Sequence, residues 1–227
     1  MSDLIAIPRQ NETASSPVAS YCISDFDALY APLIASWVRS EEELTWLAPG
    51  TAPPLSASKV IAWGNNVGYR FLFWSTDPTS DRQGLDGPIG YAELNRMPKR
   101  SNQMWIGHFV LDPDCRGRGH GQRFVQALLR HAFQVLTASD VLLVVFPENK
   151  TAIRCYEKCG MIITGRERKY FKNTHCTHHF YRMEAKRHQF EETTMARGTQ
   201  GRGIPFVRDT AQLRSGTVSR RRALNQS

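Results

Sequence analysis

A glycine-rich turn between an apolar run and an amphipathic segment constrains the fold of this chain more than any other feature. The apolar run covers residues 105–111, the turn carries Gly117, Gly119 and Gly121, and apolar residues recur at helical spacing from 122 to 136. This order predicts a strand, a tight turn and a helix. Glycines let a backbone approach a ligand closely, and the first amides of a helix are unpaired donors at the positive end of its dipole. The turn is therefore a candidate site for a phosphate or pyrophosphate.

Two common phosphate-binding motifs do not fit this turn. The dinucleotide fingerprint requires glycine or alanine where Gln122 stands, and no Gly-Lys-Ser/Thr sequence completes a nucleoside-triphosphate loop. The pattern Arg116-x-x-Gly119-x-Gly121, after an expected strand that ends at Asp112, fits a third motif. It resembles the acyl-CoA pyrophosphate motif of the GCN5-related N-acetyltransferase (GNAT) superfamily.

The resemblance continues downstream of the turn. Asn149, Ala152, Tyr156 and Gly160 occur at the spacing of that family's next helix, whereas Met161 replaces its usual phenylalanine. The flanking pattern is compatible with the same fold, a mixed α/β (α+β) arrangement. The resemblance implies a central, mostly antiparallel sheet with helices on both faces.

Apolar runs between turn signals predict the strands of that sheet. Strands are expected over residues 21–23, 69–74, 89–94, 103–111, 141–146, 162–171 and 178–184. The polar, glycine-containing loop 76–88 suits a hairpin, so the strands up to 111 are expected to form an antiparallel meander. The run 141–146 is apolar throughout, which is typical of a strand buried on both faces and paired in parallel after a crossover.

Capping signals predict helices in the N-terminal part of the chain. Ser24 with Asp27 precedes an apolar helical stripe, Ser40 with Glu43 starts a second helical piece, and residues 56–63 are expected to add another turn or two.

Two tryptophans fall within this helical segment. In the resembling family the segment borders the acceptor site, so Trp37 and Trp46 are candidates for substrate contact. An aromatic side chain on a helical stripe is more often part of the core, and we expect the core for both.

Composition divides the chain into three parts. Residues 1–19 are rich in Ser, Thr, Pro, Asn and Gln and are expected to be a disordered leader, residues 20–186 form the expected N-acetyltransferase domain, and residues 187–227 form an expected disordered tail. This tail has eight Arg and three acidic residues and so carries +5 of the net charge of +8. It lacks interleaved aromatic residues, so we expect solvation of its arginines rather than contact with nucleic acid.

The sequence indicates a cytoplasmic protein. Its five cysteines show no framework spacing, which suits reduced thiols. The apolar run at residues 4–7 is too short for a signal peptide. No stretch approaches the ~20 apolar residues that a membrane helix needs, so no membrane contact is expected.

The resemblance implies a site for acetyl-CoA, the acyl donor. Amides of the turn would hold the pyrophosphate, with Asn149 on the following helix, and backbone groups of Phe109, Val110 and Leu111 would run beside the pantetheine arm. The turn residues are Arg116, Gly117, Arg118, Gly119, His120, Gly121 and Gln122. A side chain at Gly119 would collide with the pyrophosphate, whereas Gly121 could also serve helix packing. Arg116 and Arg118 could add positive charge, although Arg118 fits a solvent-exposed loop charge equally well.

Acyl transfer to an amine needs a neutral amine, a stabilised oxyanion and a proton for the leaving thiolate. Tyr156 stands where the family commonly places the phenol that protonates the CoA sulfur, and a phenol with a pKa near ~10 is protonated at neutral pH. A backbone amide near Val110 is the expected oxyanion donor.

The sequence alone does not identify the general base. Some family members use a glutamate at the position of Val144, which leaves Glu93 and His108 on neighbouring strands as candidates, with Glu93 ranked slightly first and Glu148 third. A bulge in the strand that carries His108, usual in the family, would decide whether His108 or Phe109 points into the cleft.

A histidine-rich stretch near the last strand invites comparison with metal sites. Strand alternation sends His178 and His179 to opposite faces, and the spacings with His175 and Cys176 are not those of a structural zinc site. We expect no metal. These residues more plausibly border the acceptor cleft.

The sequence thus predicts transfer of acetyl from acetyl-CoA to a primary amine of a small molecule, peptide or protein, by direct attack in a ternary complex. No His and Asp are recognisably arranged around Cys115 for a covalent route. Val144 and Met161 leave one alternative open, a non-catalytic acyl-CoA-binding regulatory module whose basic tail contacts nucleic acid. A homodimer through the last strands would fit the resemblance, and the acceptor itself is not fixed by the sequence.

Overall fold

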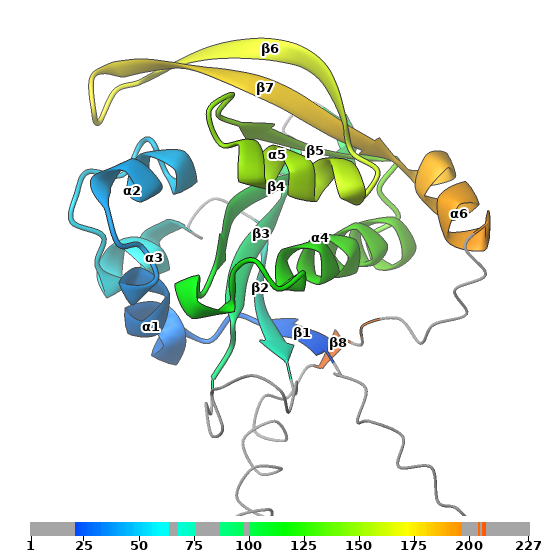
Figure 1. Ribbon diagram of the computed structural model, residues 1–227, viewed down its shortest axis with the longest axis horizontal. Coiled ribbons are helices and arrows are strands. Elements are labelled where there is room, and N and C mark those ends of the chain that lie inside the picture. The colour runs from blue at the N-terminus through cyan, green and yellow to red at the C-terminus, as the bar shows by residue number, and fades with distance from the viewer. Residues whose placement is uncertain are drawn as a thin grey trace, which may run out of the picture.

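The computed structural model of the chain describes residues 21–63, 68–75, 87–97, 100–196, 204 and 206–207. They form one sheet of eight strands in the order β6-β7-β5-β4-β3-β2-β1-β8, with helices around it (Figure 1). The expected leader and most of the 76–88 loop lie outside the described residues. No helix within the described residues combines the length and apolar character needed to cross a bilayer.

The strands agree with the predicted mixed sheet. They are β1 (Tyr21–Asp25), β2 (Gly68–Ser75), β3 (Gly90–Met97), β4 (Arg100–Leu111), β5 (Asp140–Val145), β6 (Ile162–Phe171), β7 (Cys176–Lys186) and β8 (Phe206–Val207). Strands β1 to β4 form the antiparallel meander, and β5 pairs in parallel with β4. Strand β7 pairs antiparallel with both β5 and β6.

The helices are short and connect the strands. They are η1 (Ala28–Tyr30), α1 (Ala31–Ser36), α2 (Glu41–Leu47), α3 (Ala57–Trp63), η3 (Pro113–Cys115), α4 (His120–Arg130), the π-helical turn η4 (His131–Val135), α5 (Lys150–Lys158) and α6 (Arg187–Ala196). Helix α4 is the crossover that allows β4 and β5 to run in parallel.

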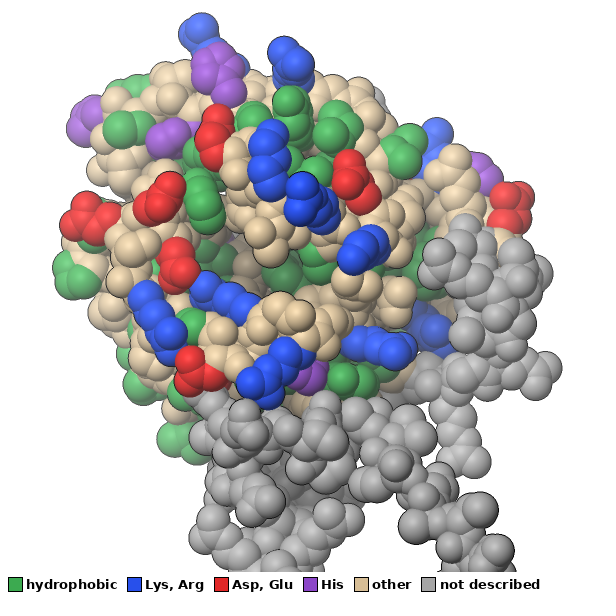
Figure 2. Space-filling model, in the orientation of Figure 1, with side chains coloured by type: hydrophobic (Ala, Val, Ile, Leu, Met, Phe, Trp, Pro, Cys, Tyr) green, Lys and Arg blue, Asp and Glu red, His purple; other side chains and the backbone are tan. Residues whose placement is uncertain are grey.

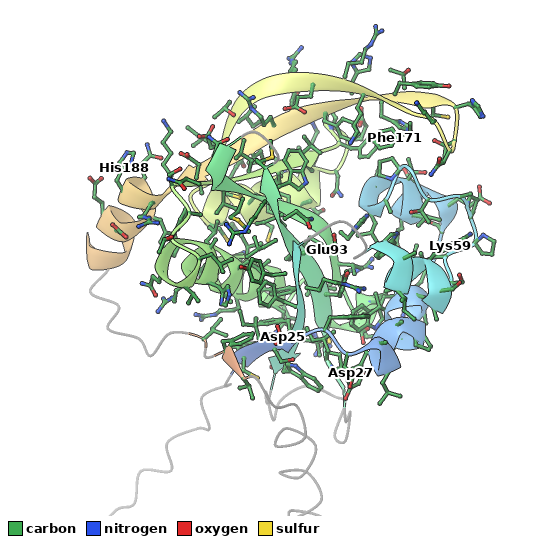
Figure 3. All side chains as sticks on the ribbon, turned by 180° about the vertical axis from the view of Figure 1, so that it is seen from behind. Asp25, Asp27, Lys59, Glu93, Phe171 and His188 are labelled. Carbon is green, nitrogen blue, oxygen red and sulfur yellow. The ribbon has the colours of Figure 1, made fainter. Side chains whose placement is uncertain are left out.

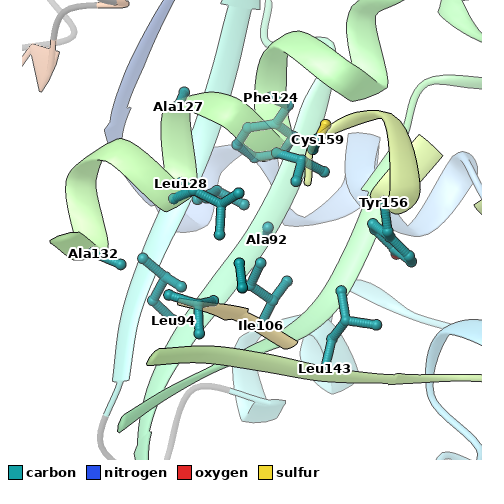
Figure 4. Packing of buried hydrophobic residues seen from close by; sticks show 14 of the residues in the cluster. Ala92, Leu94, Ile106, Phe124, Ala127, Leu128, Ala132, Leu143, Tyr156 and Cys159 are labelled. Carbon is teal, nitrogen blue, oxygen red and sulfur yellow. The ribbon is translucent and has the colours of Figure 1, made fainter. Parts of the chain in front are cut away.

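Alternation along the strands separates two cores, one on each face of the sheet. In β2, Phe71 and Phe73 join the core under α4 and α5, whereas Leu72 and Trp74 join the core under α1 and α3. Figure 4 shows how α4 side chains such as Phe124 pack onto the strands of the first core. Full burial of a side chain of this size contributes roughly 1.5–3 kcal/mol. The prediction of helices on both faces is confirmed.

The glycine-rich turn leads directly into α4. Gly119 is the N-cap residue with a φ of +83°, a left-handed conformation that favours glycine. The helix begins at His120, two residues before the predicted start, and continues through η4 to Val135.

One of the two predicted N-terminal caps is wrong. Ser24 lies in β1, where its hydroxyl accepts a hydrogen bond of 2.9 Å from the Trp74 indole. Asp27 instead caps η1 by accepting from the Leu29 amide at 2.9 Å. Ser40 does cap α2, because its Oγ accepts from the Glu43 amide at 3.1 Å.

The structure corrects the expectation of a wholly disordered tail after Lys186. Helix α6 packs Phe190 against Phe133, with ring centroids 5.3 Å apart, and β8 pairs in parallel with β1 through Phe206 and Ile23. The average composition of the tail is polar, so it does not indicate that these two phenylalanines pack against apolar residues of the domain. Apart from Ile204, which packs against the core, the remaining tail residues lie outside the described part of the chain.

Candidate active site

A cavity of about 710 Å³ opens between α2, the second half of β4, the turn before α4, and α5. Gly117, Gly119 and Gly121 line one end, and His108 and Trp46 line the other. In the space-filling view, Lys and Arg side chains gather over α5 and beside the turn on this face (Figure 2). The cavity therefore connects the predicted phosphate site with two of the predicted catalytic residues, His108 and Tyr156.

The turn has room for a ligand at its left-handed glycines. Gly117 and Gly119 have φ values of +78° and +83°, and a Cβ built on either glycine would meet no atom of the described residues within 4 Å. A Cβ on Gly121 would lie 3.3 Å from both the Cys155 Sγ and the Leu111 Cδ1. Gly121 therefore serves the packing of α4 against α5 and β4.

Arg116 ties the turn to the segment between α1 and α2. Its guanidinium lies 2.6 Å from Glu43 Oε1 and donates to the carbonyl oxygens of Trp37 at 3.1 Å and Leu111 at 3.2 Å. Burial works to raise the pKa of Glu43, but hydrogen bonds from the Arg39 amide and the Arg116 guanidinium, with the charges of both residues, hold it below its ordinary range. The sequence predicts Arg116 beside the phosphates, whereas its contacts with Glu43 and Trp37 depend on the tertiary structure.

Only some of the other residues predicted at the acetyl-CoA site line the cavity. Arg118 is exposed, whereas the His120 side chain is buried with its ring 5.7 Å from that of Tyr21. Gln122 and Asn149 line the cavity. Asn149 also caps α5, since its Oδ1 accepts from the Ala152 amide at 3.1 Å.

The predicted bulge occurs in β4. Pairing with β3 shifts where His108 and Phe109 together stand opposite Ala92, and His108 has a φ of +44°. Both residues line the cavity. His108 stacks on Trp63 at a centroid distance of 4.2 Å, while Phe109 packs on Phe124 at 5.1 Å. The bulge thus sends the two neighbouring residues to different faces of the sheet.

Glu93 is buried on β3, near the centre of the sheet (Figure 3). Its Oε2 lies 3.0 Å from His108 Nδ1 and accepts from the Asn95 amide nitrogen at 3.2 Å, while its Oε1 accepts from the Tyr91 hydroxyl at 2.6 Å. Burial alone would raise the pKa of Glu93, but His108, Tyr91 and Asn95 lower it below its ordinary value. The side chain is therefore a carboxylate at neutral pH.

The cavity reaches His108 but not Glu93. The His108 side chain is 26% exposed and that of Glu93 4%, and only His108 of the two is among the described residues that line the cavity. Behind the pair, Arg70 Nε donates to the Tyr91 hydroxyl at 3.0 Å. Tyr91 could have been found from the sequence, because it precedes Glu93 by two strand positions and so shares its face.

Tyr156 lines the cavity from α5. Its ring meets that of Phe109 edge-on at 6.1 Å, and no hydrogen bond joins its hydroxyl to another described residue. Burial, with a smaller contribution from Cys155 and Cys159, raises the pKa of Tyr156 well above its ordinary value. The hydroxyl therefore holds its proton at neutral pH.

The tryptophans of the first helices behave differently from each other. Trp37 is 2% exposed and belongs to the core under α1 and α3, as expected. Trp46 lines the cavity beside Leu47 and Val38, so the expectation of a core position is wrong for Trp46. The helical stripe alone could not distinguish them, because α2 has one face toward the cavity.

The histidines near β7 lie away from the cavity lining. His178 packs among Phe146, Phe171 and Phe180 beneath the β6–β7 hairpin, whereas His179 is exposed. Among the residues that the structure describes, no group of three or more His, Cys, Asp or Glu side chains could hold a metal ion.

The tip of the β6–β7 hairpin reaches the segment after α2. Thr174 Oγ1 donates to the Pro49 carbonyl at 3.1 Å, and Asn173 Nδ2 donates to the Gly50 carbonyl at 3.2 Å. Figure 1 shows the hairpin arching over α5 to the α2 side of the molecule. The hairpin therefore links the β6–β7 edge of the sheet to the segment that follows α2.

Curated relatives match the central part of the chain. The probable spermine N(1)-acetyltransferase of Bacillus subtilis subsp. natto (strain BEST195) is 26% identical over 82 residues, which cover 34% of this chain and 54% of the relative. The spermidine N(1)-acetyltransferase of Vibrio cholerae serotype O1 is 27% identical over 84 residues, 37% of this chain and 46% of the relative. The matches thus span about half the length of these relatives.

Solved structures share the fold over most of the chain. Spermidine N-acetyltransferase from Vibrio cholerae, in complex with CoA and spermine, has a TM-score of 0.60 at 17% identity, covering 76% of this chain and 98% of that chain. Aminoglycoside acetyltransferase AAC(6')-Ib, in complex with ribostamycin and coenzyme A, has a TM-score of 0.60 at 20% identity, covering 77% and 97%.

A family model provides the assignment. The model of the acetyltransferase (GNAT) family matches residues 37–161, more than half of the chain, from the end of α1 past the C-terminus of α5. That range contains the turn, the β4 bulge and Tyr156, which together form the cavity. The chain therefore belongs to the acetyltransferase (GNAT) family.

Proposed function

We propose that the protein is an N-acetyltransferase that moves acetyl from acetyl-CoA to a primary amine by direct attack in a ternary complex. The observation that carries this proposal is the single cavity that joins the glycine turn at one end to His108 and Tyr156 at the other. A donor bound along β4 would bring its thioester between the two side chains.

Acetyl-CoA fits the donor end of the cavity. The first amides of α4 and the open space at Gly117 and Gly119 suit a pyrophosphate. Lys150, Arg154 and Lys158 line the cavity from α5 and supply positive charge for the phosphates. The backbone of Phe109 to Leu111, beyond the bulge, would lie beside the pantetheine arm. When bound, acetyl-CoA supplies the activated acyl group.

His108 is the group that we propose as the base. Its Nδ1 lies against the Glu93 carboxylate, which leaves Nε2 for the proton of the attacking amine. The carboxylate fixes the orientation of the ring and stabilises the imidazolium that forms. Glu93, ranked first from the sequence, acts in this proposal as a positioning residue because it is buried behind His108.

Tyr156 is the acid that we propose for the leaving thiolate. Its hydroxyl keeps its proton because burial raises its pKa, and the hydroxyl is not engaged with another described residue. A proton passed from Tyr156 Oη to the CoA sulfur would leave a phenolate that takes up the amine's proton through solvent. A backbone amide near Val110 is the proposed donor to the oxyanion.

We propose a small, positively charged amine as the acceptor. The names of the curated relatives specify spermine or spermidine, and one of the similar structures holds an aminoglycoside complex. In this chain, Trp46 and the exposed Glu148 line the cavity and could attract a cation. The hairpin bridge through Thr174 to Pro49 favours a slender substrate over a folded protein surface.

We also propose that the protein works in the cytoplasm, without nucleic acid as a partner. None of the five cysteines, all of which the structure describes, forms a disulfide, which suits a reducing compartment. A homodimer through the last strands stays a proposal too. It is supported by the outer position of β6, where Ile162 and Ile163 are exposed.

Calorimetric titration with acetyl-CoA tests the donor site. Gly119→Glu places bulk and negative charge in the proposed pyrophosphate site and should abolish binding. Gly160→Glu is the matched control, because Gly160 also has a left-handed φ of +86° and open space around its Cβ but does not line the cavity. It should bind acetyl-CoA like the unchanged protein.

An amine panel with release of free CoA as readout then tests the chemistry. Turnover of polyamines or aminoglycosides is the expected result. A folded protein that binds no acetyl-CoA contradicts the proposal, and binding without turnover of any amine favours the non-catalytic alternative.

A further inference from the structure

Helix α5 places two thiols beside the donor end of the cavity. Cys155 is half-buried and lines the cavity, and Cys159, one helical turn later, is buried. The Cys159 sulfur lies 3.5 Å from the Gln122 carbonyl oxygen. Neither thiol has a part in the proposed acetyl transfer.

The position of Cys155 is set by Gly121. A Cβ on Gly121 would lie 3.3 Å from the Cys155 sulfur, so this sulfur rests on the first turn of α4. The amides of that turn are the proposed pyrophosphate donors. The α4 backbone therefore closes one side of the sulfur, and the donor end of the cavity lies beside it.

The surroundings favour the thiolate of Cys155. A hydrogen bond from the Cys159 thiol lowers the pKa of Cys155, burial opposes this effect, and the positive charge of Lys158 lowers the pKa further. The N-terminus of α4 acts in the same direction. The charged side chains that line the cavity are mainly basic: Arg116, Lys150, Arg154 and Lys158 against Glu43 and Glu148.

The molecule also contains thiols for comparison. Burial raises the pKa of Cys22 to about 11, so Cys22 stays a thiol at neutral pH. Cys115 is buried, and Cys176 is exposed on the hairpin away from the cavity lining. Cys155 therefore differs from them by combining access, a lowered pKa and a place in the binding cavity.

We propose that Cys155 is a site of reversible thiol modification, at which a low-molecular-weight disulfide forms a mixed disulfide that closes the donor end of the cavity. The thiolate attacks one sulfur of the disulfide, a new S–S bond forms, the original S–S bond breaks, and the second half leaves as a thiolate. A reducing thiol reverses the step in the same way. The link to acetyl-CoA rests on the proposed function.

The experiment uses full-length Cys176→Ser protein, which removes the exposed reference thiol. Treatment with oxidised glutathione at neutral pH and peptide mass mapping should find one adduct, on Cys155, and none in the Cys155→Ser, Cys176→Ser double variant. With N-ethylmaleimide, acetyl-CoA at one hundred times its Kd should slow labelling of Cys155 by roughly 100-fold. Adducts that form at Cys22 or Cys115 as fast as at Cys155 overturn the proposal.

Calorimetry tests the closure. The glutathione adduct of the Cys176→Ser protein should lose acetyl-CoA binding and regain it after treatment with dithiothreitol, whereas the double variant should keep its own affinity through the same treatment. An adduct on Cys155 that leaves binding unchanged overturns the closure. If the reduced, unmodified protein does not bind acetyl-CoA, the proposed function is wrong. The position of the adduct and the rate at which it forms still show whether Cys155 is the reactive thiol.

Discussion

At the scale of single residues, Tyr156 offers a sharp test of the proposed chemistry. Tyr156→Phe removes only the hydroxyl and keeps the ring that packs against Phe109. Loss of a general acid typically lowers turnover by about 10²- to 10⁴-fold, and we expect kcat to fall within that range. Acetyl-CoA affinity should change little, because the ring still fills its place. Steady-state kinetics and calorimetry measure the two quantities, and equal losses in both would refute the role of Tyr156 as acid.

The pair of Glu93 and His108 predicts a pH-dependent stability effect. The pKa of Glu93 is held below its ordinary value of 4.5, so its ionisation stabilises the folded state above that pH, and this contribution is lost as the pH falls through the lowered pKa. Glu93→Gln should therefore cost about 1–3 kcal/mol at pH 7. Thermal melts should show the two proteins converging in acid, below pH 4.5.

The activity of Glu93 variants distinguishes a role of Glu93 in positioning His108 from a purely structural role. Glu93→Gln keeps a side chain that can hold the His108 ring but does not stabilise the imidazolium, so we expect a lower kcat with a shifted pH profile. Glu93→Asp should recover part of the loss. A pH profile that keeps its shape in Glu93→Gln would mean that Glu93 only supports the fold.

At the scale of elements, the bridge from the β6–β7 hairpin to the α2 side should control acceptor binding. Thr174→Ala with Asn173→Ala removes two hydrogen bonds to the Pro49 and Gly50 carbonyls, each worth about 0.5–1.5 kcal/mol. We expect a higher KM for the amine, relaxed discrimination against bulky amines, and unchanged acetyl-CoA affinity. Lys172→Ala, in the same tip without a hydrogen bond to Pro49 or Gly50, is the control. If KM for the amine and the selectivity stay unchanged, the bridge has no role in acceptor binding.

At the scale of the whole molecule, the C-terminal segments should contribute to stability. A chain that ends at Lys186 loses the contacts of Phe190 with Phe133 and of Phe206 with Phe71. Full burial of a side chain of this size contributes roughly 1.5–3 kcal/mol and both phenylalanines are half-buried, so we expect the free energy of unfolding in urea to fall by part of this amount for each. A chain that ends at residue 212 keeps both contacts and serves as control. Equal stability of the two truncated chains would contradict this.

Some features of the molecule follow from local sequence. The strand, turn and helix around Gly119 depend on neighbouring residues and on a backbone angle that favours glycine, and the apolar run 141–146 indicated a buried parallel strand. The family resemblance brought Tyr156 to the same site, and the cavity contains it. The turn and the buried strand were predictable because short-range sterics and periodicity determine them, whereas Tyr156 was predictable only from the resemblance.

Other features required the tertiary structure. Ser24 and Asp27 both have side chains that can cap a helix, and only the pairing of β1 with β2 turns Ser24 toward Trp74. Composition could not place Phe190 or Phe206, because each lies in a polar segment and gains its contact from residues far away in the chain.

The site itself shows the division most clearly. Its sequence determined that Glu93 and His108 lie on neighbouring strands, but a one-residue slip in β4 decided that His108 faces the cavity with Glu93 behind it. In the same way, the sequence of α5 determines the position of Cys155 along that helix. The close packing of Gly121 against α5 places the Cys155 sulfur beside the glycine turn. Periodicity sets which residues share a face of one element. Register and packing between elements set which faces meet, and those depend on contacts that no single segment contains.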